Sequence, residues 1–171
     1  MKKITWSYLF LLVTGVFIIN TSFSDQYYYD GWKYIPVFMK RIDLEQSVSY
    51  QTDARVIENA GKIYYKAPYI FINEKYKGVH VINNSNPQSP VNEGFIVVPG
   101  CIDIAAKGNI LYLDNSVDLV AFDFSSKQVT KRIKNVFPEP VSPGNEHFIS
   151  SREKDEFIIV NWKINPNYKR K

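Results

Sequence analysis

Two short stretches, Gly78–Asn83 (GVHVIN) and Asp118–Asp123 (DLVAFD), decide how this chain of 171 residues folds. In each stretch apolar residues dominate and a polar residue closes the run, which is typical of a β-strand. The two stretches align at an offset of 40 residues, and Phe71–Asn73 aligns with Tyr112–Asp114 at an offset of 41. One deletion in the hairpin between them reconciles the offsets, so the sequence contains a repeat of about 40 residues.

Short apolar runs separated by turn residues fill both copies of the repeat. Gly, Pro, Asn and Asp lie between the runs, and these residues favour turn dihedrals or lack the amide hydrogen that a strand ladder needs. We expect strands at 62–66, 69–74, 79–83 and 93–98, and again at 102–106, 109–114, 117–124 and 128–134. Four strands in a period near 40 are typical of a propeller blade. The sequence therefore predicts an all-β fold of tandem four-stranded antiparallel blades, β-propeller-like and either complete or incomplete.

The expected organisation has three parts. These are a signal peptide at 1–24, a lead-in region at 25–61 and propeller-like repeats at 62–171, with blades at 62–100 and 101–138 and a partial blade at 145–171. The lead-in is ambiguous, because 34–50 fits either a short helix around 40–48 or an extended segment.

The last apolar run and one glycine give two sharper expectations. Phe157–Trp162 contains no charge, so as an open edge it would be poorly solvated. We expect it to pair with the N-terminal region of the same chain or with another copy. Gly78 should lie at a hairpin end with positive φ, where a side chain would be strained.

The N-terminus has the pattern of a signal peptide. Lys2 and Lys3 precede an uncharged apolar run at 4–19, and the small residues Ser22 and Ser24 follow it. We expect cleavage after Ser24 and an exported chain that is periplasmic, at the cell surface or secreted. The alternative is an uncleaved anchor, although this run is shorter than the ~20 residues that span a bilayer as a helix.

Charge and cysteine content exclude two classes of protein. The chain has 21 basic and 17 acidic residues, and removing Lys2 and Lys3 leaves 19 against 17, a balance of +2 that is not typical of nucleic-acid binding. Cys101 is the only cysteine, so no intramolecular disulfide can form. We expect Cys101 to be a small buried apolar residue.

The stretch Gly78–Pro90 resembles the LVIVD repeat, a β-propeller-type repeat of exported bacterial proteins. Pro36–Arg41, with Leu44-Glu45 and Ser47-Val48 behind it, is similar to the lead-in of those proteins. The resemblance covers about Trp32 to Pro138 and implies a fold rather than an activity. Members of that family are longer and often lipid-anchored, whereas this chain has no lipobox cysteine and about two and a half recognisable blades. Three explanations stay open: the N-terminal region supplies further strands, the chain pairs with another copy or partner, or it is truncated.

The polar residues of the repeats do not form a recognisable metal or cofactor motif. His80 and His147 have no second ligand at a zinc-binding spacing. The oxygen donors near the hairpins lack the order of a calcium loop, so turn chemistry is the favoured interpretation. They are Asn73, Glu74, Asp114, Asn115, Asp118 and Asp123. We expect no metal and no cofactor.

No catalytic residue can be named, because no nucleophile elbow is present and the 17 acids give no reason to choose a pair. Aromatic residues crowd the start of the mature chain, and Tyr28, Trp32 and Tyr34 are candidate contacts for a ligand. For Trp32 and Tyr34 the favoured interpretation is that they begin the core.

The favoured function is a non-enzymatic interaction module of the cell envelope that binds a protein or a glycan. It would not bind nucleic acid, and it would meet a membrane only through an uncleaved N-terminal segment. Open edge strands could also support self-association. The alternatives are an envelope hydrolase acting on carbohydrate or peptide, and a truncated remnant of a longer propeller protein.

Overall fold

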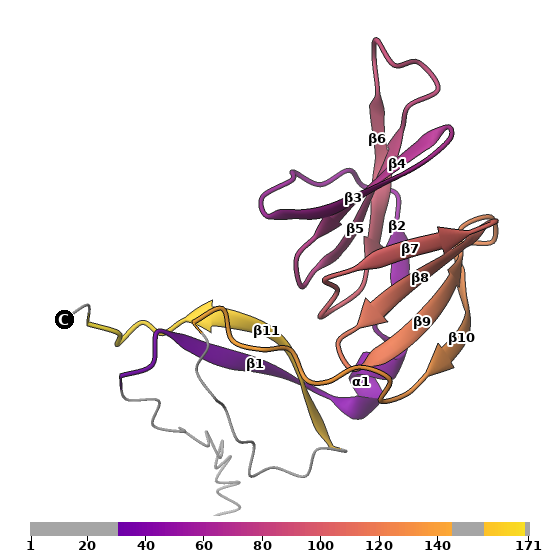
Figure 1. The fold of residues 1–171 in the computed structure, drawn as a ribbon. Coiled ribbons are helices and arrows are strands. Elements are labelled where there is room, and N and C mark those ends of the chain that lie inside the picture. The colour runs from indigo at the N-terminus through magenta and orange to yellow at the C-terminus, as the bar shows by residue number, and fades with distance from the viewer. Residues whose placement is uncertain (1–30, 145–155, 170–171) are drawn as a thin grey trace, which may run out of the picture.

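The computed structural model describes residues 31–144 and 156–169, which form antiparallel β-sheets with one short helix (Figure 1). The predicted all-β class is confirmed. The described sheets do not close into a barrel or a propeller. The expected signal peptide at 1–24, Tyr28, His147 and the first part of the expected partial blade lie outside the described residues.

A five-stranded sheet contains the first copy of the repeat. Its spatial order is β2-β6-β5-β4-β3, and β3 to β6 follow one another as a meander. The strands are β2 (Ser49–Gln51), β3 (Ala60–Lys66), β4 (Tyr69–Glu74), β5 (Gly78–Asn83) and β6 (Val91–Val97). This sheet has one strand more than the expected four, because Ser49–Gln51 adds to its edge by pairing with Phe95–Val97.

A four-stranded sheet, in the order β10-β9-β8-β7, contains the second copy. Its strands are β7 (Ile104–Lys107), β8 (Ile110–Asn115), β9 (Asp118–Asp123) and β10 (Gln128–Ile133). The central hairpins of the two sheets turn in the same way, since Tyr76 and Ser116, 40 positions apart, have φ of 64° and 59°. This agreement supports the alignment of the two copies.

The two sheets pack face to face and enclose the main core. One side contributes Phe71, Val79 and Val81, and the other contributes Leu111 and Phe122. Each of these five side chains is at most 1% exposed. Alternation along β4, β5, β8 and β9 places these residues on one face of their strand, so the period of two in the sequence determines which faces meet.

The ends of the described chain form a third, two-stranded sheet. Strand β1 (Tyr34–Lys40) pairs antiparallel with β11 (Phe157–Ile164). The expected pairing of the last apolar run with the N-terminal region is therefore confirmed. The described part of 145–171 contributes β11, which takes its partner strand from the lead-in.

The ambiguous lead-in contains both of the structures that the sequence allowed. Helix α1 (Arg41–Gln46) follows β1 directly and buries Leu44 completely. The Ser47 hydroxyl donates to the Leu44 carbonyl at 2.8 Å, which satisfies one of the last carbonyls of the helix. A second core joins Leu44 to Val117 of the four-stranded sheet and to Ile158 and Val160 of β11. The helix thus packs the end strands against the second repeat.

Candidate functional site

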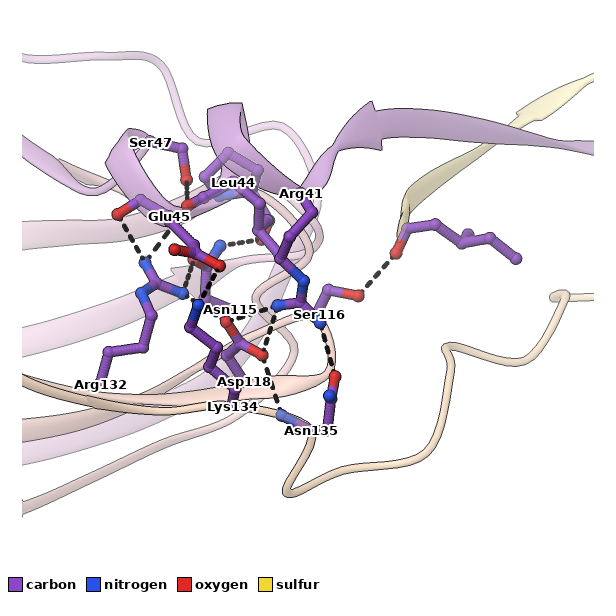
Figure 2. Close-up of polar contacts among 12 residues, drawn as sticks. Arg41, Leu44, Glu45, Ser47, Asn115, Ser116, Asp118, Arg132, Lys134 and Asn135 are labelled. Carbon is purple, nitrogen blue, oxygen red and sulfur yellow. Dashed lines mark hydrogen bonds and ion pairs between the residues drawn. The ribbon is translucent and has the colours of Figure 1, made fainter. Parts of the chain in front are cut away.

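A buried ion cluster joins α1 to the four-stranded sheet (Figure 2). The carboxylate of Asp118, at the start of β9, is fully buried. Nη1 of Arg41 donates to its two oxygens at 2.8 and 2.9 Å, and Nη1 of Arg132 donates at 2.8 Å. The backbone amide of Asn135 adds a bond of 3.0 Å. Arg132 also donates to the carbonyls of Leu44 and Glu45 at 3.2 and 3.3 Å.

These contacts hold Asp118 in its ionised form. Burial alone would raise its pKa, but hydrogen bonds from Arg41, from the Asn135 amide and from Arg132 together lower the pKa below its ordinary value. The carboxylate accepts from both guanidinium groups and from the amide at the same time. The cluster therefore positions α1 rather than offering a base to a substrate.

A second polar pair lies on the five-stranded sheet, beneath the segment 52–59 that crosses from β2 to β3. His80 and Glu74 are 0% and 2% exposed, and His80 Nε2 lies 3.2 Å from Glu74 Oε2. The Glu74 carboxylate accepts the amides of Glu58 and Asn59 at 3.1 and 2.7 Å. Burial acts to raise the pKa of Glu74, but these amides, His80 and Lys77 lower it. Arg55 covers the neighbouring Phe95, 4.4 Å from the ring centroid. Glu74 thus anchors the crossing segment.

Cys101 is buried between the two sheets, as expected. Its Sγ accepts from Asn73 Nδ2 at 3.3 Å, and its exposed fraction is 0%. Burial, with the negative charge of Asp114 nearby, raises the pKa of the Cys101 thiol well above its ordinary value. A thiol that stays protonated is a poor nucleophile, so Cys101 belongs to the core.

A half-buried cation lies among aromatic rings where the turn from β9 to β10 meets β2 and β4. Lys127 Nζ lies 3.1 Å from the centroid of Phe124 and 4.5 Å from that of Tyr50. Tyr69 meets Phe124 edge to face, with 4.9 Å between centroids. Burial lowers the pKa of Lys127, and the charge of Glu93 opposes this effect. We call Tyr50, Tyr69, Phe124 and Lys127 the aromatic–lysine cluster.

The structure separates this cluster from the aromatic residues that the sequence singled out. Trp32 and Tyr34 are half-buried at the start of β1, and neither belongs to the two core clusters. The Trp32 carbonyl accepts from Asn165 Nδ2 at 2.9 Å, and Lys33 Nζ lies 5.2 Å from the Tyr34 ring. The sequence does not reveal the aromatic–lysine cluster, because its members come from three separate segments and no motif joins them.

The expected oxygen donors mostly bind backbone at turns. Asp114 accepts the amides of Ile102 and Asp103 at 3.0 and 2.8 Å, and Asp123 accepts that of Ser125 at 2.8 Å. Asn115 Nδ2 donates to the Pro99 carbonyl at 2.6 Å. Within 31–144 and 156–169, no three His, Cys, Asp or Glu side chains are grouped so that they could hold a metal ion.

Comparison with known proteins returned no matching family model, no matching curated protein and no matching solved structure. Among the described residues, no helix has the length and apolar character that crossing a bilayer requires.

Proposed function

We propose that this protein is an exported, non-enzymatic interaction module of the cell envelope, and that it binds an acidic glycan at the aromatic–lysine cluster. The signal-peptide pattern of residues 1–24 supports export. The carboxylates of Glu74 and Asp118 support a role without catalysis, since structural partners already engage them.

The two repeated meanders are, in this proposal, successive propeller-like blades. Their alignment near 40 residues, their matching turns at Tyr76 and Ser116 and their face-to-face packing support this arrangement. In such an arrangement the turns of neighbouring blades come together at one end, where ligands are commonly bound. The aromatic–lysine cluster combines residues of both sheets in this way.

The environment of Lys127 is the reason that we propose an acidic ligand. Its ammonium group is half-buried against two rings, and the ion pairs formed within the described part of the chain do not include it. A ligand carboxylate would form a direct ion pair with Lys127, in addition to the charge of Glu93 that already acts on it, and a charged hydrogen bond is strongest where water is partly excluded. The rings of Tyr50 and Tyr69 provide the apolar contact area that a sugar ring requires.

Calorimetric titration of the purified protein with oligouronates, and with neutral oligosaccharides of equal length, tests this function. We expect binding of the acidic series only, and a loss of at least about tenfold in affinity for Lys127→Gln, which is ~1.4 kcal/mol. Lys75→Gln removes an exposed lysine near the opposite end of the five-stranded sheet and should leave the affinity unchanged. Equal affinity for both series, binding of acidic peptides alone, or cleavage of the oligosaccharides would each overturn the proposal.

A further inference from the structure

Because the two larger sheets are copies of one repeat, each face of the five-stranded sheet corresponds to one face of the four-stranded sheet. In the core, the five-stranded sheet presents Phe71, Val79 and Val81. The aligned residues of the four-stranded sheet, Tyr112, Leu119 and Ala121, lie on the side away from that core, because they alternate with its buried residues. We call the side with Phe71 in one sheet and Tyr112 in the other the front face.

The opposite side of each sheet, its back face, follows the same rule. The four-stranded sheet presents Ile104, Leu111 and Leu113 to the core. Their aligned residues at an offset of 41 are Ile63, Ile70 and Ile72, on the uncovered side of the five-stranded sheet. The strand register confirms the match, since Ile63 pairs with Ile72 and Ile104 pairs with Leu113. Within the chain, therefore, the front face of the five-stranded sheet packs on the back face of the four-stranded sheet.

One back face and one front face remain uncovered. On the back of the five-stranded sheet, Ile63 and Tyr65 are 67% and 62% exposed. The open part of this face is uncharged, because its other members are Ile70, Ile72 and Ile82, while the crossing segment 52–59 covers His80 and Phe95. On the front of the four-stranded sheet, Tyr112 and Ile133 are 37% and 46% exposed. Exposed large apolar side chains thus lie on both faces, and on the front face the exposed Lys131, which pairs with Ala121, lies beside them.

The charges beside these faces are complementary. Lys62 and Asp103 form an ion pair of 2.5 Å across the packed sheets, and their side chains are 64% and 55% exposed. These two residues are themselves aligned at an offset of 41. If a second copy stacked as the two sheets already stack, Asp103 of one copy would lie beside Lys62 of the other. The new contact would therefore bring opposite charges together.

We propose that the protein binds further copies of itself head to tail, with the front face of the four-stranded sheet of one copy on the back face of the five-stranded sheet of the next. This inference rests on the blade arrangement proposed above and not on the glycan site. A contact between two different faces either closes into a ring or continues as a filament. Two copies supply four repeat sheets, two from each chain, and closed rings typically contain four or more blades.

Sedimentation velocity of the purified protein over a wide concentration range, without glycan, tests the proposal. We expect the wild-type chain to form a discrete oligomer. Ile63→Asp damages the back face and Tyr112→Asp the front face, and each variant alone should be monomeric. An equimolar mixture should regain a dimer, because the intact front of the first variant meets the intact back of the second. Ile164→Asp, at a position 66% exposed on β11, should assemble as the wild type does.

Three results would overturn the inference. They are a wild-type chain that stays monomeric at every concentration, a mixture of the two variants that stays monomeric while the wild type assembles, and an equal loss of assembly in Ile164→Asp. The second result would mean that the front of one copy does not meet the back of the next. Lys127→Gln should assemble normally, so failure of assembly and failure of glycan binding are separate outcomes.

Discussion

The five-stranded and four-stranded sheets hold the same loop with different side chains. In each meander a carboxylate near the end of the second strand accepts two backbone amides of the segment that leads into the first strand. In the four-stranded sheet this residue is Asp114, which aligns with Asn73. In the five-stranded sheet it is Glu74, one position later and one methylene longer. The contact is thus retained although the residue and its position differ.

The sheets differ more at the start of their third strand. Gly78 has φ of 145°, and a Cβ there would lie 2.0 Å from the Ile96 carbonyl oxygen, so β5 and β6 approach too closely for a side chain. Asp118 occupies the aligned position and binds two arginines, one of them 77 positions away in α1. The five-stranded sheet closes here through its own backbone, whereas the four-stranded sheet depends on the lead-in.

Replacing Asp118 tests that dependence most strongly. Asp118→Asn leaves the buried guanidinium groups of Arg41 and Arg132 without their countercharge, and breaking a buried pair costs about 3–5 kcal/mol. Urea unfolding followed by circular dichroism should show this loss. Asp123→Asn, at the other end of β9, is the matched control and should leave the midpoint nearly unchanged. Similar midpoints for both variants would contradict the structural role of the cluster.

Replacing Gly78 tests the close approach in the five-stranded sheet. Gly78→Val should cost about 1–3 kcal/mol, because the side chain combines backbone strain with a clash against Ile96. Gly108, with φ of 58°, is the control, because a Cβ at that position would meet no atom within 4 Å. Gly108→Val carries the strain without the clash, so thermal unfolding should place its loss below that of Gly78→Val. Equal losses of stability would show that the close approach of β6 adds nothing to the cost of a side chain at Gly78.

The pH dependence of two conservative substitutions gives the smallest effect and the sharpest contrast. The pKa of Glu74 is lowered in the fold, so its contribution to stability is present above its ordinary value of 4.5 and is lost as the pH falls through the folded value. Burial raises the pKa of Asp114 above its ordinary value of 3.8, so its contribution is largest in acid and declines as the pH rises through the folded value.

Urea unfolding near pH 7 and near pH 3 measures this contrast. Glu74→Gln should cost more at the higher pH, and Asp114→Asn should cost more at the lower pH. The two trends should have opposite sign. Parallel trends would mean that the two carboxylates have the same electrostatic environment, despite their different surroundings.

Strands with strong local patterns could be predicted from the sequence, and contacts between distant segments could not. Strand β4 begins and ends at the expected residues, and β5 begins one residue earlier than expected. Gly78 has the expected positive φ. The alternating apolar residues and the turn residues that predict a strand lie within a few positions of one another. A short stretch of sequence therefore contains the whole signal for the strand.

The missed features all depend on tertiary contacts. The three residues of β2 have no pattern of their own and become a strand only beside β6. His80 alternates along β5 with Val79 and Val81 and so lies on the other face of the sheet, yet it is buried because the segment 52–59 crosses over it. The cluster at Asp118 and the aromatic–lysine cluster join segments that no local spacing relates. Their chemistry becomes visible only once the sheets have placed them together.

The pairing of β1 with β11 constrains the order in which the chain can complete its fold. Trp32 and Asn165, which meet beside this sheet, are 133 positions apart. A ribosome or a translocation channel delivers the N-terminal end first, so β1 must wait unpaired until nearly the whole polypeptide has emerged. Contacts of such long range also close slowly. Premature termination anywhere before Phe157 would leave β1 and α1 without the strand that covers them, and a quality-control protease could recognise that exposed end.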